Sequence, residues 1–243
     1  MLSPDPAPQT AQTVLVVLAA LWGAATGLLL PRPAHRLSVE PEEPWRAEDP
    51  AGRPIRGWLG TARYGPSAPA LTLCTALVCA LLAAATGTRP ELGAWLLLAP
   101  LCVLLATVDF AVHRLPDVLT LPLAGLALAA LGAAALLPEP GGSWRGALLG
   151  ALGMAAFYLV LHLISPRGMG FGDVKLAVGL GAALGWYGLG VLAIGVFAGV
   201  LGNGLYAAVL VVTRRAGRRT EIPFGPFMIM GGFVGVLLGA LAA

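Results

Sequence analysis

The sequence predicts an all-α, polytopic membrane protein with about eight transmembrane helices. Of its 243 residues, 58% are hydrophobic and only 11% are charged, whereas about 25% of the residues in a soluble domain carry a charge. The mean hydropathy is +0.83. A soluble protein of this composition would have too few polar residues to cover its surface. A disordered chain would need a much smaller fraction of apolar residues. Both classes are therefore excluded, and the length allows roughly eight spans with their connections.

Apolar runs of membrane-crossing character recur along the chain. Basic residues follow the first run and do not precede it, which favours a transmembrane helix over a secretory signal. A Pro-rich polar stretch at 31–69 comes next and is expected to be a loop with short structure at most. The expected spans are 14–30, 70–86, 93–108, 118–137, 144–164, 174–187, 188–212 and 224–242.

The basic residues orient these spans. With the N-terminus outside, the inside loops hold thirteen of the fifteen Lys and Arg residues, and the outside loops hold only Arg89 and Arg145. Lys and Arg accumulate in the cytoplasmic loops of membrane proteins. We therefore expect eight spans with the N-terminus outside. The basic charge is spread over loops and not gathered into a patch, so nucleic-acid binding is not expected.

Four acidic residues fall at the cytoplasmic ends of the expected spans, where charge is costly to hold. Asp117 follows Pro116 at a helix start, where a carboxylate commonly caps the helix. Asp109 ends a helix, where its charge opposes the helix dipole, so its position needs another reason. Asp173 opens a helix after a Gly-rich stretch that allows a close approach by another chain. Glu221 is the fourth.

Asp109 and Asp173 lie on different spans at the same side of the membrane, which indicates a paired-carboxylate site. Two carboxylates a few Å apart cannot both ionise cheaply, so they share a proton. Such a pair can deprotonate water while it protonates a carbonyl oxygen, which is the chemistry of aspartic proteases.

Three short motifs follow one another in the second part of the chain. They are Asp109 with LPDVLTLPL at 115–123, GFGD at 170–173 continued by VKL, and EIPFGPF at 221–227. In this order and spacing they resemble the motifs of the type IV prepilin peptidase family, which are membrane aspartic endopeptidases of the GxGD group. The resemblance covers residues 93–243, expected to form the peptidase-like membrane domain. Residues 1–92 are expected to add two membrane helices and the loop at 31–69.

The resemblance implies a role for each motif residue. Asp109 and Asp173 would be the catalytic pair, with no metal required, and Gly170 and Gly172 would admit the extended substrate backbone. Lys175 would either help to place Asp173 or bind a substrate carboxylate, and an interfacial positive anchor is the alternative. The family removes a short basic leader from type IV pilin or pseudopilin precursors at the cytoplasmic face of the inner membrane. The implied partners are such a precursor and the lipid bilayer.

The loop at 31–69 departs from the pattern of the resemblance. Many members also methylate the new N-terminus with S-adenosylmethionine, and these typically carry two zinc-binding CxxC pairs in this loop. The loop here contains no cysteine, so zinc is not expected there. Proteolysis needs no cofactor, and S-adenosylmethionine is expected only if methyl transfer occurs as well.

Two other functions are compatible with acids in membrane spans. One is a proton-coupled transporter, because intramembrane acids are common proton-relay groups. Against it, the acids gather at one interface and no inverted repeat is evident. The other is a GxGD intramembrane protease of a different branch, against which the motif at 221–227 argues.

Overall fold

A computed structural model describes residues 6–40, 43–62, 64–166, 168–214 and 222–243, and within these ranges the regular structure is helical apart from one isolated bridge between Glu48 and Pro54. The described helices are α1 (Pro6–Gly27), α2 (Pro31–Leu37), α3 (Ala68–Thr86), α4 (Leu92–Val112), α5 (Asp117–Ala134), α6 (Trp144–Ile164), α7 (Phe171–Trp186), α8 (Leu189–Val212) and α9 (Gly225–Ala242).

The helix pattern confirms the predicted all-α membrane fold. Seven of the described helices are long and apolar enough to cross a bilayer. The helix at the position of the remaining expected span is α7, which has 16 residues and is therefore about 24 Å long, against a hydrocarbon core of about 30 Å. The short structure expected in the loop at 31–69 is α2.

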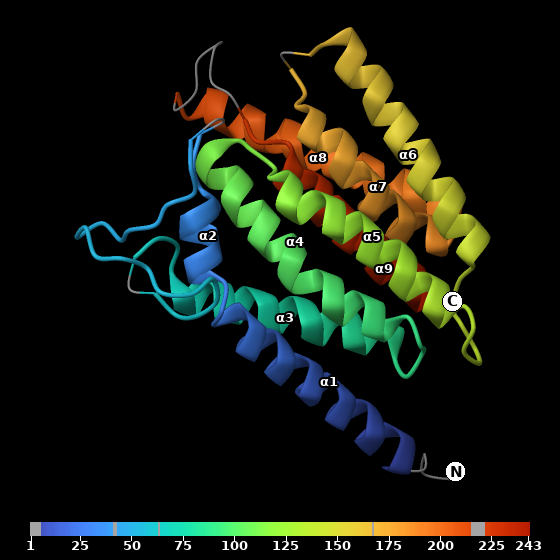
Figure 1. Ribbon diagram of the computed structural model, residues 1–243. Helices are drawn as coiled ribbons and strands as arrows, with labels where there is room; N and C mark the ends of the chain where they lie inside the picture. Colours follow the sequence, from blue (N-terminus) through green and yellow to red (C-terminus); the bar gives the residue numbers. More distant parts are fainter. Residues whose placement is uncertain (1–5, 41–42, 63, 167, 215–221) are drawn as a thin grey trace.

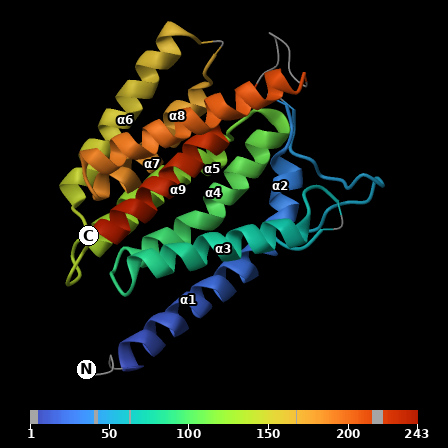
Figure 2. The same cartoon turned by 180° about the vertical axis from the view of Figure 1, so that it is seen from behind.

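α7 lies in the interior of the bundle. It packs on α6 most extensively, then on α5, α9 and α8, and nearly every residue from Asp173 to Trp186 is buried. Because protein surrounds it, α7 does not need the length of a lipid-facing span. Figures 1 and 2 show α6 at one edge of the bundle and α1 at the other, where α1 packs mainly on α3.

Glycines set the spacing of α6 and α7. A Cβ built on Gly150 of α6 would lie 2.3 Å from the carbonyl oxygen of Gly181 on α7. A Cβ on Gly185 would lie 2.4 Å from the carbonyl oxygen of Gly146. Small residues let helix backbones approach closely where lipid supplies no hydrophobic drive for association. Small residues therefore pack closely at this interface.

The bundle has two distinct ends. One, here called the motif end, carries the last turn of α4 and the first turns of α5, α7 and α9. The opposite end carries Glu91, which is completely buried. Its carboxylate accepts hydrogen bonds from the N–H of Gly141, at 3.1 and 3.2 Å, and from the hydroxyl of Tyr187 at 3.3 Å. These partners come from the α5–α6 loop and the end of α7, and Glu91 itself lies at the start of α4, so it ties three segments together.

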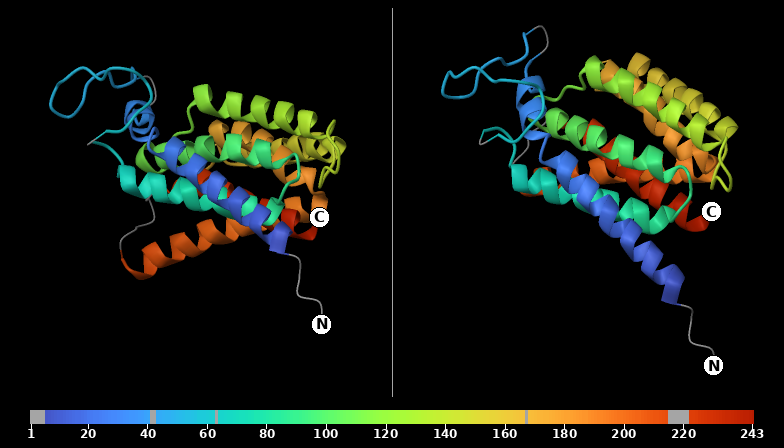
Figure 3. Two further views of the ribbon diagram at one scale, coloured as in Figure 1. Left: turned by 90° about the horizontal axis from the view of Figure 1, so that it is seen from below. Right: turned by 60° about the horizontal axis from the view of Figure 1, so that its bottom comes forward.

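The loop that follows α2 projects beyond the motif end of the bundle, as the two views of Figure 3 show. Arg114, between α4 and α5, donates to the carbonyl of Glu40 at 3.0 Å and so holds the start of this loop against the bundle. The division of the chain at residue 92 stays a prediction.

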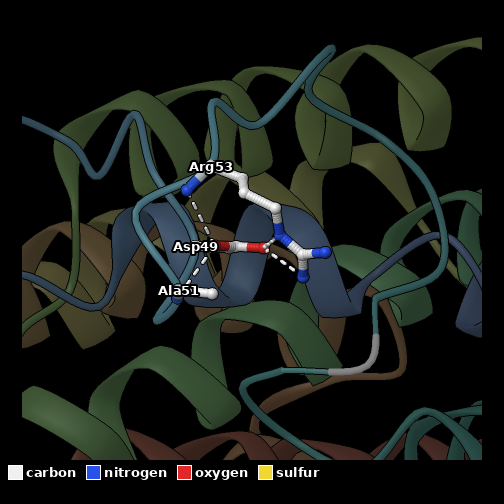
Figure 4. A network of polar contacts seen from close by, with 3 residues as sticks. All are labelled: Asp49, Ala51 and Arg53. Carbon is white, nitrogen blue, oxygen red and sulfur yellow. Dashed lines mark hydrogen bonds and ion pairs between the residues drawn. The ribbon is translucent and has the colours of Figure 1, made fainter.

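A tight turn closes part of this loop on itself. The carboxylate of Asp49 accepts hydrogen bonds from the backbone N–H groups of Arg53 and Ala51 and from the Arg53 guanidinium (Figure 4). These bonds, the backbone N–H of Arg53 foremost, hold the pKa of Asp49 below its usual value. Surface ion pairs of this kind add little stability, so the turn fixes the shape of the loop more than its stability.

Candidate active site

Asp109 lies in the last turn of α4 and is 4% exposed. Its Oδ2 accepts a hydrogen bond from the backbone N–H of Gly225, the first residue of α9, at 3.0 Å. The free N–H groups and positive dipole end of a helix N-terminus stabilise a carboxylate. This contact explains the position of Asp109. Its charge opposes the dipole of α4 but lies at the positive, N-terminal end of the α9 dipole.

Gly225 must be small to make this contact. A Cβ on Gly225 would lie 2.6 Å from Oδ2 of Asp109 and 3.2 Å from the Leu115 side chain. Pro226 occupies the first turn of α9, where its missing N–H is not needed. Gly225 and Pro226 thus shape the entry to the last helix.

Asp173 lies in the first turn of α7 and is 6% exposed. Its Oδ2 accepts a hydrogen bond from the backbone N–H of Gly170 at 3.1 Å, and its own N–H donates to the carbonyl of Gly170, also at 3.1 Å. Asp173 is therefore held by the start of its own helix, which stabilises negative charge there.

The two glycines of the GFGD motif have different surroundings. A Cβ on Gly172 would lie 2.9 Å from the Cβ of Leu115, so Gly172 lets this loop pack on the α4–α5 connection. Gly170 is exposed, and a Cβ there would make only ordinary contacts, with Oδ2 of Asp173 at 3.6 Å and the backbone N of Gly172 at 3.9 Å. The backbone beside Asp173 is therefore accessible at Gly170 and closed at Gly172.

The structure brings the two predicted acids together. Leu115 contacts the positions of both Gly172 and Gly225, and these glycines adjoin Asp173 and bind Asp109 respectively. The site therefore consists of two buried carboxylates, Asp109 at the end of α4 with the start of α9 beside it and Asp173 at the start of α7.

Lys175 and Asp117 form an ion pair beside this site. The Lys175 Nζ donates to both carboxylate oxygens of Asp117, at 2.6 and 2.7 Å. The expectation that Asp117 caps α5 was wrong in detail: Asp117 lies in the first turn, the capping position is Pro116, and no side chain caps the helix. The carboxylate turns toward α7 because Lys175 offers it a charged partner. Lys175 correspondingly binds Asp117 on α5.

Two residues of α6 belong to this site and were missed by sequence reasoning. Nδ1 of His162 lies 2.8 Å from the carbonyl oxygen of Met169, so it donates a hydrogen bond to the loop before Asp173. Tyr158 is buried, contacts the ring of Phe224 at a centroid distance of 5.9 Å, and is close enough to feel the charge of Asp173. Their signal in the sequence was the four-residue spacing of two polar rings in an apolar span, which places them on one helix face.

The expectation that no metal is needed and the position expected for Glu221 both stay predictions. Within the described ranges, no three His, Cys, Asp or Glu side chains gather closely enough to hold a metal ion. Glu221 lies outside the described residues. The second half of its motif is described and forms the start of α9.

The fold and the site define a class: a polytopic helical membrane protein with two buried carboxylates at one end of its bundle. The profile of the type IV leader peptidase family matches residues 96–213. A prepilin leader peptidase/N-methyltransferase of Stutzerimonas stutzeri is 30% identical over 228 residues, which cover 89% of this chain and 75% of the relative. The chain therefore belongs to the type IV leader peptidase family.

Further relatives carry the same name. That of Pseudomonas aeruginosa is 33% identical over 181 residues, covering 73% of this chain and 60% of the relative. That of Aeromonas salmonicida is 34% identical over 182 residues, covering 74% of this chain and 59% of the relative. The matched part thus spans about 60% of the length of these two relatives. No solved structure gives a significant match.

Proposed function

We propose that this protein is a membrane-embedded aspartic endopeptidase that removes the leader peptide of type IV prepilin-like precursors. The observation that carries the proposal is the pair of buried carboxylates of Asp109 and Asp173 at the motif end, held by the backbone N–H groups of Gly225 and Gly170. Membership of a leader peptidase family supports the substrate class.

The reaction follows from a pair that holds one proton. The ionised carboxylate takes a proton from a water molecule between the two groups, and the water oxygen bonds to the scissile carbonyl carbon. The protonated carboxyl gives its proton to the carbonyl oxygen. Collapse of this tetrahedral species breaks the C–N bond, and a proton passes to the leaving nitrogen. The products are a leader with a new carboxyl group and a mature chain with a new amino group.

The surrounding residues keep the pair in place. The N–H of Gly225 fixes Oδ2 of Asp109, and the N–H of Gly170 fixes Oδ2 of Asp173. Both donors are backbone groups at helix starts, so they need no reorganisation during the reaction. Burial strengthens each of these interactions. The open side at Gly170 is where an extended substrate backbone would approach Asp173.

The proposed topology places this site at the cytoplasmic face of the inner membrane. The basic residues of the sequence support an N-terminus outside, and Arg114 lies at the motif end, between α4 and α5. A precursor whose hydrophobic helix lies in the bilayer would then present its scissile bond at the level of Asp109 and Asp173.

Methyl transfer is not included in the proposal. The relatives are named N-methyltransferases as well, and that reaction would need S-adenosylmethionine, a polar and charged molecule. The cavity of about 380 Å³ in the described structure is lined by apolar side chains such as Leu98, Val103 and Phe233. These apolar residues do not suit such a cofactor.

Cleavage of a co-expressed prepilin in membranes tests the proposal. The leader is followed by gel shift, and the new N-terminus by mass spectrometry. Asp109→Asn and Asp173→Asn should each abolish processing at equal expression. Glu139→Gln is the matched control, because Glu139 is an exposed acid at the opposite end. If the wild type processes no pilin-like precursor, the proposal fails and a transport assay becomes the next experiment.

A further inference from the structure

An apolar cavity lies between α3, α4, α5, α7 and α9, and its lining residues Phe110 and Pro226 are the chain neighbours of Asp109 and Gly225. Its volume is about 380 Å³, and it runs along α4 from Trp95 to Phe110. The side chains that line it are apolar except for Thr107 and the thiols of Cys74 and Cys102. A polar or charged ligand would lose its hydration here without replacement hydrogen bonds, so the occupant must be apolar.

The cavity is continuous with the lipid-facing surface. Three of its lining residues, Cys74 on α3, Phe110 on α4 and Met230 on α9, are exposed on the outside of the bundle. α3, α4 and α9 each qualify as membrane-crossing helices. The mouth of the cavity therefore opens on hydrocarbon, and the molecules that reach it first are membrane lipids.

The length and the volume of the cavity limit the size of the apolar molecule that it can hold. From Pro226 to Val236 on α9 the lining extends about 15 Å at 1.5 Å per residue, which is about half of the 30 Å hydrocarbon core and thus the depth of one leaflet. A cavity of about 150 Å³ holds the six carbons of benzene, so 380 Å³ holds roughly fifteen.

We propose that this cavity binds one acyl chain of a bilayer phospholipid. An acyl chain has the required length, thickness and carbon number, and it enters from the lipid-facing mouth between α3 and α9. In this position it fills the space between α4 and α9, the two helices that the bond from Gly225 to Asp109 joins at the motif end. Lipid binding at this site does not require the proposed peptidase activity.

Photocrosslinking of the detergent-purified protein tests the proposal. The probe is phosphatidylglycerol with a diazirine in its acyl chain, and the adducts are mapped by mass spectrometry. Wild-type protein should carry cavity adducts on α4 and α9, and unlabelled phosphatidylglycerol should compete for them at about one lipid per protein. Ala106→Phe, which fills the cavity, should reduce these adducts at least five-fold. Ala208→Phe, on the exposed face of α8, is the matched control and should leave them unchanged.

Several results would overturn the proposal. They are equal labelling of wild type and Ala106→Phe, adducts spread evenly over α3, α4, α8 and α9, and displacement of the probe by a prepilin, which would assign the cavity to the substrate. Gel filtration shows whether Ala106→Phe folds, and Cys102→Phe fills the same cavity from another position. If neither variant folds, the competition experiment on the wild type decides, since non-saturating adducts would exclude a defined site.

Discussion

Lys175 on α7 donates two short hydrogen bonds to the carboxylate of Asp117 on α5. Lys175 lies two residues after Asp173 in the chain. The pair links two of the three motifs recognised in the sequence. It also draws the first turn of α7 toward α5, so it contributes to the placement of Asp173.

Breaking this ion pair should weaken the site moderately. Lys175→Met and Asp117→Asn should each lower the free energy of unfolding by up to about 1 kcal/mol, because the Asp117 carboxylate is largely solvated. A fall of about 2–4 °C in melting temperature corresponds to this value. Cleavage should slow a few-fold, and the charge-reversed double variant Asp117→Lys with Lys175→Asp should recover part of the loss. Equal melting temperatures for all variants would mean that the pair is incidental.

Adding a single methyl group at Gly225 should disable the site. In Gly225→Ala the new Cβ meets Oδ2 of Asp109 at 2.6 Å, so the carboxylate or the start of α9 must move. A displacement of about 1 Å at reacting groups costs about a hundred-fold in rate, and we expect that loss in prepilin cleavage. Gly204→Ala is the control, since a Cβ at Gly204 of α8 meets nothing within 4 Å. Unimpaired cleavage by Gly225→Ala would contradict the described contact.

His162 should act by holding the loop before Asp173. His162→Phe keeps the ring beside Phe171, whose centroid is 5.5 Å away, but loses the hydrogen bond to Met169. A bond of this kind contributes about 1 kcal/mol, which corresponds to roughly a five-fold lower kcat. His162→Gln retains an N–H donor and should recover part of the rate. Should both variants match the wild type in kcat and KM, the hydrogen bond has no part in placing the loop.

The interface between α6 and α7 should tolerate no side chain larger than hydrogen at Gly150. Gly150→Leu places its Cβ against the backbone of Gly181 and Gly185, so α6 must separate from α7. We expect aggregation or a much lower yield of folded protein in detergent, measured by fluorescence-detected gel filtration. Gly153→Leu lies on the same helix with open space around it and should behave like the wild type. Similar profiles for both would show that the helices do not pack as described.

Periodicity and hydropathy predict most of this fold, because burial in lipid demands long apolar helices whatever their tertiary contacts. The span at 144–164 coincides with α6, and the other spans differ from their helices by a few residues at most ends. The largest difference is at α1, which starts before the apolar run. The interior position and short length of α7 could not be predicted, since these depend on the helices that surround it.

The acidic residues of the candidate site could be predicted from the sequence, but the contacts that hold them in place could not. Asp109 and Asp173 stand out because acids are rare in spans. The contact between Asp109 and Gly225 joins residues 116 positions apart, and no local pattern encodes it. The burial of Glu91 is likewise not encoded locally, because Gly141 and Tyr187 supply its hydrogen bonds from distant segments.

The central claim is that the two carboxylates act as one catalytic unit, and the rate of prepilin cleavage by purified single and double variants tests it most directly. Each of Asp109→Asn and Asp173→Asn should lower the single-turnover rate in proteoliposomes by about a thousand-fold or more, and the double variant should be no slower than either, as expected for groups of one unit. A single variant that retains a tenth of the wild-type rate, or a double variant slower by the product of the two losses, would contradict the account.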